Sequence, residues 1–122
     1  MIESDLRNEI LGDAAVVAIV ADRMFLKAPI EPQTSSYLTY FRQGKSRDMV
    51  AEFNRFQITA FSKDTLELEQ LCEAVIEALE GKKSLNGNEY YSNSLIGQSD
   101  SREKLDDGFF WSIMTFEFKH TN

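Results

Sequence analysis

Residues 55–81 read RFQITAFSKDTLELEQLCEAVIEALEG and contain the clearest structural signal in the chain, a strand that leads directly into a helix. In the first part, Phe56, Ile58 and Ala60 alternate with polar residues, and this period predicts a half-buried strand. In the second part, apolar residues recur at helical spacing and predict one amphipathic helix. They are Leu68, Leu71, Cys72, Val75, Ile76 and Leu79. We therefore expect this helix to pack on the sheet face that carries Phe56, Ile58 and Ala60.

Both ends of this helix carry recognisable signals. Asp64, with Glu67 following at capping-box spacing, predicts the helix start. Gly81 predicts the end, because glycine readily adopts the left-handed conformation that closes a helix. The polar face is acidic, with glutamates at 67, 69, 73, 77 and 80. The helix should therefore present carboxylates to solvent.

Composition indicates one acidic domain. The 122 residues fit a single unit spanning 1–122, and no apolar run is long enough to span a bilayer. The acidic start of the chain does not resemble a signal peptide, so we expect a soluble product made in the cytoplasm. A net charge of −7 without a basic patch argues against a protein that grips duplex DNA.

The N-terminal third predicts helices and then a short strand. Residues 2–20 form two helical pieces interrupted at Gly12, and Asp13 is the expected N-cap of the second. The second piece is apolar on nearly all sides, so it should be buried, either under the sheet or against a neighbouring subunit. A turn at Asp22 leads into a strand at 24–26, and the proline-containing segment 29–35 should be an extended loop.

Strand patterns also lie on both sides of the central strand and helix. Residues 36–42 predict a strand, and the irregular segment 43–52, here called the first arm, predicts an exposed hairpin. After an Asn-Gly turn signal at 86–87, residues 90–96 predict a weaker strand. The polar segment 97–107, here called the second arm, predicts a loop, and 109–119 a long strand that is apolar on both faces.

These elements predict an α+β fold. We expect an antiparallel or mixed β-sheet of about five strands, with the long helix and the N-terminal helical segment packed on it.

The sequence offers little chemistry. His120 adjoins the end of the sequence, and Cys72 lies in an apolar stripe, so neither indicates a nucleophile and base pair. The acidic residues of the second arm lack calcium-loop spacing, and Gly44 lacks the first glycine of a phosphate-binding loop. We therefore expect no enzyme activity, no cofactor and no metal. A small enzyme using Glu52 or Asp107 is a minor alternative.

Four stretches of the sequence resemble the tail-terminator, or tail-completion and head-to-tail joining, family of tailed bacteriophages. Residues 11–25 resemble the family's first helix and its Asp-Arg turn into the first strand. Residues 37–40 resemble its second strand, and 56–62 its central strand running into the 71–79 helix. Residues 110–118 resemble its closing strand.

The resemblance implies a structural protein of a tailed phage or prophage that caps the tail tube and joins tail to head as a hexameric ring. The implied partners are copies of itself, the tail-tube protein and head-connector proteins. DNA would pass through without specific binding, and no membrane would be involved. The protein would assemble in the host cytoplasm and reside in the virion tail or neck.

The two arms are the candidate contacts with neighbouring subunits or with the ring lumen. Their candidate residues are Lys45, Ser46, Arg47, Asp48, Asp100, Arg102, Glu103 and Lys104. Two other non-catalytic functions stay open from the sequence: an α+β adaptor or binding module, and another neck (head-completion) component. An adaptor would be monomeric or dimeric, so a size measurement separates it from a ring.

Overall fold

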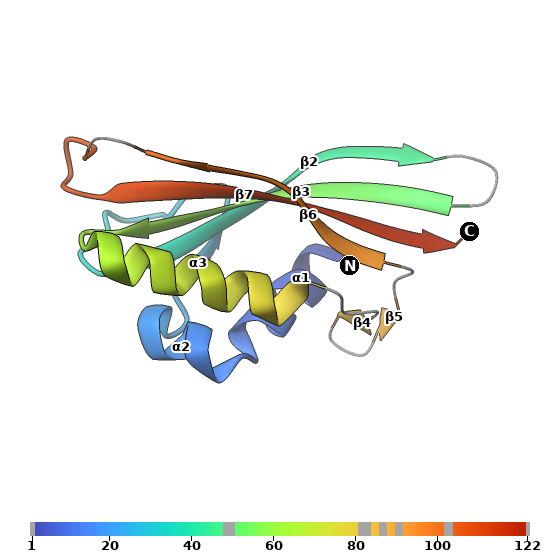
Figure 1. The fold of residues 1–122 in the computed structure, drawn as a ribbon, viewed down its shortest axis with the longest axis horizontal. Coiled ribbons are helices and arrows are strands. Elements are labelled where there is room, and N and C mark those ends of the chain that lie inside the picture. The colour runs from blue at the N-terminus through green and yellow to red at the C-terminus, as the bar shows by residue number, and fades with distance from the viewer. Residues whose placement is uncertain are drawn as a thin grey trace.

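A computed structural model describes residues 2–47, 51–80, 84–85, 88–89, 92–101 and 104–121 (Figure 1). The helices are α1 (Ile2–Leu11), α2 (Ala14–Val20) and α3 (Thr65–Leu79). The main sheet contains β1 (Met24–Leu26), β2 (Tyr37–Arg47), β3 (Ala51–Ser62), β7 (Phe110–Thr121) and β6 (Ser92–Asp100), in that spatial order. Strand β1 is parallel to β2 and the other neighbours are antiparallel. The expected α+β fold with a mixed five-stranded sheet is confirmed.

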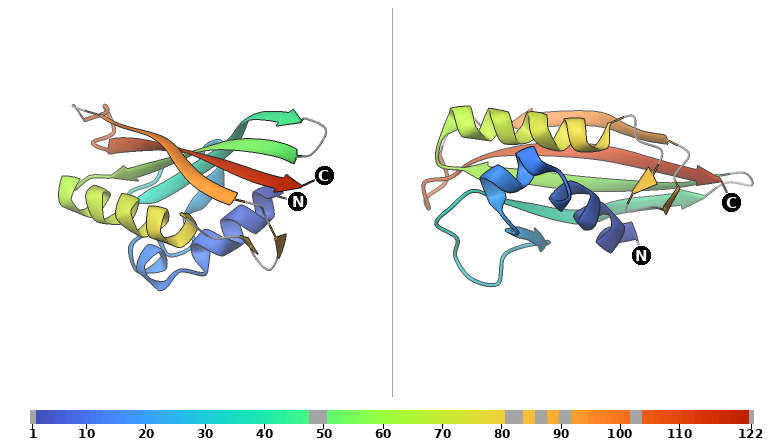
Figure 2. Two further views of the ribbon diagram at one scale, coloured as in Figure 1. Left: turned by 45° about the vertical axis from the view of Figure 1, so that its right-hand side comes forward. Right: turned by 90° about the horizontal axis from the view of Figure 1, so that it is seen from below.

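The helices form one layer and the sheet forms the other (Figures 1 and 2). Long helix α3 lies along the sheet, and α1 and α2 lie on the same side (Figure 2). The sheet face beneath them, here called the covered face, has apolar side chains with no solvent exposure. On β3 and β7 these are Phe56, Ile58, Ala60, Met114, Phe116 and Phe118. The predicted packing of the helix on Phe56, Ile58 and Ala60 is therefore confirmed.

Helix α3 begins where the sequence predicts, but the hydrogen bonds of its first turn differ from the predicted ones. The Asp64 carboxylate accepts hydrogen bonds from the backbone N–H groups of Leu66 (2.8 Å) and Glu67 (3.4 Å), as an N-cap does. The predicted capping box does not close. The Asp64 N–H donates instead to Ser62 Oγ (3.2 Å), and the Glu67 carboxylate accepts hydrogen bonds from the hydroxyls of Ser36 and Ser62. Glu67 thus joins the helix to the ends of two strands.

At its other end, α3 stops at Leu79, and the Glu80 N–H donates to the Ile76 carbonyl at 2.7 Å. The predicted closing residue, Gly81, lies outside the described residues. The apolar stripe of α3 is wider than its contact with the sheet. Leu71, Val75 and Leu79 are fully buried, whereas Ile76, which the sequence pattern puts mid-stripe, is only partly buried.

The two N-terminal helices confirm the predicted break and its cap. Asp13 Oδ1 accepts hydrogen bonds from the N–H groups of Ala15 (3.0 Å) and Val16 (3.2 Å) at the start of α2. The predicted burial of this apolar helix is right for one side only. Val16 and Val20 are buried, but Val17 is 40% exposed. Burial of the exposed side against a neighbouring subunit stays a prediction.

The strands extend further than their sequence patterns predict. Strands β2 and β3 run into the first arm and stay paired to Arg47 and Glu52, so its described part is a strand extension. The prediction of a loop at 97–107 is wrong for residues 97–100, which belong to β6 and pair with β7. Their polar composition concealed the strand, because β6 is an edge strand with exposed side chains.

Two predicted turns flank these strands. Residues 86–87 lie outside the described residues, but β4 (Ser84–Leu85) and β5 (Asn88–Glu89) pair across them as the Asn-Gly signal predicts. The turn before β7 is confirmed. Gly108 has a φ of +88°, a conformation that favours glycine.

Candidate functional site

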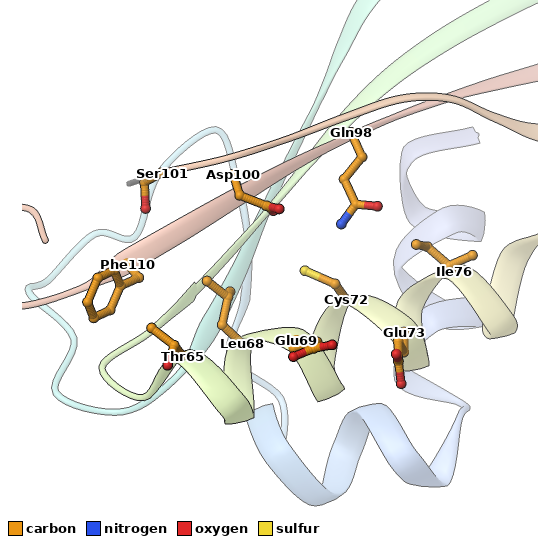
Figure 3. A pocket seen from close by; sticks show the side chains of 10 residues that line it. All are labelled: Thr65, Leu68, Glu69, Cys72, Glu73, Ile76, Gln98, Asp100, Ser101 and Phe110. Atoms are coloured by element: carbon orange, nitrogen blue, oxygen red, sulfur yellow. The ribbon is translucent and has the colours of Figure 1, made fainter. Parts of the chain in front are cut away.

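A groove of about 430 Å³ lies between α3 and the β6–β7 edge of the sheet (Figure 3). Its helix side carries both apolar and acidic side chains, and its strand side is mainly polar. The lining residues are Thr65, Leu68, Glu69, Cys72, Glu73, Ile76, Gln98, Asp100, Ser101 and Phe110. The partial burial of Ile76 is explained by this groove, because the side chain faces it (Figure 3).

A hydrogen-bonded cluster joins two residues that line the groove, Gln98 and Asp100, to the buried Ser112. Ser112 is fully buried, donates its hydroxyl proton to Asp100 Oδ1 and accepts from Gln98 Nε2 at 3.4 Å. Cys72 is buried beside it. Burial raises the pKa of the Cys72 thiol, and the nearby carboxylates of Asp100 and Glu69 raise it further, against the opposing hydrogen bond with Ser112. A thiol held in its neutral form is a poor nucleophile.

The carboxylates considered for an enzyme lie outside this groove and have structural partners. Glu52 Oε1 is 2.8 Å from Lys45 Nζ across the first arm. Asp107 Oδ1 accepts a hydrogen bond from the Phe109 N–H at 3.1 Å and so stabilises the turn into β7.

No group of three or more His, Cys, Asp or Glu side chains gathers among the described residues in a way that would hold a metal ion. In the same part of the chain, no helix is long and apolar enough to cross a membrane.

The described residues of the two arms lie at opposite ends of the sheet (Figure 1). Lys45, Ser46 and Arg47 belong to β2, and Lys45 is ion-paired with Glu52. Asp48 lies outside the described residues. The structure therefore puts Lys45, Ser46 and Arg47 together at the end of β2.

The second-arm candidates divide between a strand and a loop. Asp100 is the last residue of β6, and its carboxylate is bonded to Ser112 rather than projecting freely. The ammonium group of Lys104 lies 5.4 Å from the centre of the Phe110 ring. Arg102 and Glu103 lie outside the described residues. A role for these residues in subunit contacts stays a prediction.

The sheet face opposite the helices, here called the open face, carries an aromatic cluster that the sequence indicated only in part. The Tyr37 ring stacks on Phe61 at 4.5 Å and meets the edges of Phe25 (6.1 Å) and Phe109 (5.3 Å). Burial raises the pKa of Tyr37, with a further contribution from Asp107. The out-of-phase position of Phe61 in its strand was the sequence signal for this cluster.

This chain is similar to known proteins in its fold. No protein-family model and no curated protein matches the sequence. Among solved structures, the fold is similar to a chain in "Virion of native gene transfer agent (GTA) particle", with a TM-score of 0.75 and 14% identity. The match covers 96% of this chain and 92% of the other. At this identity the likeness shows a shared fold.

Proposed function

We propose that this chain is a structural protein of a tailed phage, prophage or phage-derived particle. In that role it caps the tail tube and joins the tail to the head as a hexameric ring. The observation that carries the proposal is the fold similarity to a gene transfer agent virion chain, which extends over nearly the whole length of both chains. The independent resemblance of the sequence to tail-terminator proteins supports the same function.

The inert character of the groove supports a non-catalytic role. Its buried thiol is held neutral, and its Asp100 carboxylate is bonded to the buried Ser112 hydroxyl. A virion component needs surfaces for its neighbours and no reactive group. We therefore propose that the chain is not an enzyme and that the groove is part of a contact surface.

The size of the chain is compatible with a ring. Its accessible surface is 7040 Å², and two interfaces of about 800 Å² each would cover roughly a quarter of it. Exposed or partly exposed apolar residues on α2 and on the open face of the sheet are available for such contacts. The net charge of −7 suits a ring around DNA, since carboxylates near the lumen repel phosphates and prevent DNA from binding there.

Deletion of the gene from the phage or prophage that carries it tests this function. Electron microscopy should then show filled heads and separate tails, and the wild-type gene supplied in trans should restore joined particles. Intact joined particles in the absence of the gene would contradict the proposal.

Cryo-EM of wild-type particles distinguishes the remaining candidates. A ring of this chain at the head-proximal end of the tail supports the tail terminator. A ring nearer the portal would favour another head-completion component, since the similarity to a virion chain is compatible with either position. A single copy at that position, or none, would contradict the ring hypothesis and favour an adaptor.

A further inference from the structure

The main sheet has an unpaired stretch on each of its two edges. Strand β1 covers β2 only at residues 38–40, and the Lys27 N–H donates to the Tyr40 carbonyl at 2.9 Å as the last bond on that side. From 41 to 47, no strand in the described part of the chain pairs with the outer side of β2. The outer side of β6 is likewise unpaired among the described residues.

These two stretches lie on opposite edges of the sheet, at the same position along the strand direction. Pairing through β3 and β7 brings Phe41 level with Gly97 and Ser46 level with Ser92. Because the steps from β2 through β3 and β7 to β6 are all antiparallel, β2 and β6 run in opposite directions. A second copy placed beside the first in the same orientation would therefore set its β2 antiparallel to β6.

The two edges also differ in charge. The free stretch of β2 carries Arg42, Lys45 and Arg47 in its sequence and no carboxylate. The groove carboxylates Glu69, Glu73 and Asp100 lie beside residues 98–101, and residues 92–97 of β6 contain no charged residue. Pairing β2 with β6 therefore sets a basic stretch against an uncharged one, whereas pairing two β2 edges brings like charges together.

Each edge also contains an irregularity at nearly the same height. The β2–β3 register shifts between Arg42 and Gly44, and the β6–β7 register shifts between Leu95 and Gly97. Bulges bend and twist a strand and make an edge a poor partner for a straight foreign strand. A second copy, whose own edge bends at the matching height, meets this shape requirement.

We propose that residues 41–47 of β2 in one copy pair antiparallel with residues 92–97 of β6 in the next copy. The sheet then continues from copy to copy in a head-to-tail arrangement, which forms a ring when the rotation closes. The inference rests on the proposed ring and specifies its contact. The neighbour's β1 limits the contact to these halves of the strands, because it already occupies residues 38–40 of β2.

Disulfide trapping in assembled particles tests this contact. In a Cys72→Ala background, Lys45→Cys is combined with Asn93→Cys, two positions that lie level through β3 and β7. Leu95→Cys and Gly97→Cys replace Asn93→Cys in a scan that allows for a shift along the strand. A disulfide needs Cα atoms within about 7 Å, so only paired positions should link. Under oxidation, non-reducing gels should show a ladder up to the ring size.

Two controls test whether a ladder arises from pairing of β2 with β6. Lys45→Cys combined with Ile30→Cys keeps two exposed thiols but moves one to a loop position that is 99% exposed, and it should give no ladder. Lys45→Cys alone should also give no dimer, since a dimer would indicate β2–β2 pairing and overturn the proposal. Thermal unfolding of each reduced variant checks that it folds.

The outcomes separate this inference from the proposed function. Particles that contain the chain but give no ladder at any scanned pair overturn the strand pairing and leave the virion function standing. If particles lack the chain, the virion function fails. The same pairs are then oxidised in the concentrated purified protein, where a ladder supports the pairing and its absence overturns it.

Discussion

Both faces formed by strands β3 and β7 carry apolar side chains, but the fold covers only one of them with helices. On the covered face, Phe56, Ile58 and Phe116 have no solvent exposure. On the open face, Phe61, Trp111 and Ile113 are only partly buried, because no described helix lies over them (Figure 1). The chain therefore carries more apolar surface than its own helices cover. The covered face stabilises the monomer, and the open face leaves area for contacts with other molecules.

The largest expected effect comes from a matched pair of isoleucines on the two faces. Ile58→Ala on the covered face should lower the free energy of unfolding by about 2 to 5 kcal/mol, since it removes buried methylenes and leaves a cavity. Ile113→Ala on the open face should cost about 1 kcal/mol, because less area is buried and no closed cavity forms. Denaturant unfolding measures both. Equal losses would show that the faces do not differ in the free monomer.

A smaller effect is expected at the margin of the covered face. The helical pattern alone puts Ile76 in the core, but its side chain borders the groove. Ile76→Ala should therefore cost about 1 to 2 kcal/mol, below the roughly 2 to 5 kcal/mol expected for Leu71→Ala on the same helix. Thermal or denaturant unfolding of the two variants compares them. A loss at Ile76 as large as that at Leu71 would argue that the groove is closed in solution.

The covering helix also depends on its cap. Asp64→Ala removes the acceptor for two backbone N–H groups and should cost about 1 kcal/mol. Asp64→Asn is the matched control, because asparagine caps a helix about as well and should change stability little. Unfolding midpoints measure both variants. If both lose stability equally, the Asp64 charge rather than its hydrogen bonds would be responsible.

The smallest expected effect is a pH dependence at Cys72. Burial raises the pKa of this thiol in the folded protein above its ordinary value of 9.0. Below pH 9.0 the thiol is protonated in both states, whereas above it the unfolded chain ionises first and becomes relatively more stable. Wild-type stability should therefore fall as pH rises beyond 9.0, and the deficit of Cys72→Ala relative to wild type should shrink. A deficit that is constant with pH would contradict a buried thiol.

Much of the helical layer could be predicted from local sequence. The caps Asp13 and Asp64 and the apolar spacing of α3 involve residues within a few positions of each other, so the sequence displays them directly. Strand β6 was harder to predict from the sequence. Its residues 97–100 resemble a loop because they are polar, and their pairing with β7 depends on residues distant in sequence.

The candidate contact residues show the same division. Sequence polarity predicted an exposed hairpin at the first arm, but it could not show that β2 and β3 stay paired as far as Arg47 and Glu52. The sequence predicts a polar loop around Asp100, whereas its carboxylate is bonded to Ser112 in the sheet. The groove escaped prediction because its walls come from α3 and β6, which meet only in the folded chain.

The sequence by itself determined the change from strand to helix after residue 62, the helix caps and the two-sided apolar character of β7, since these depend on neighbouring residues. Only the tertiary structure decided which of the two apolar faces of β7 the helices cover. It also decided that Glu67 bonds Ser36 and Ser62, and which edges of the sheet stay unpaired. These outcomes depend on contacts between distant segments, and a local pattern is compatible with several such arrangements.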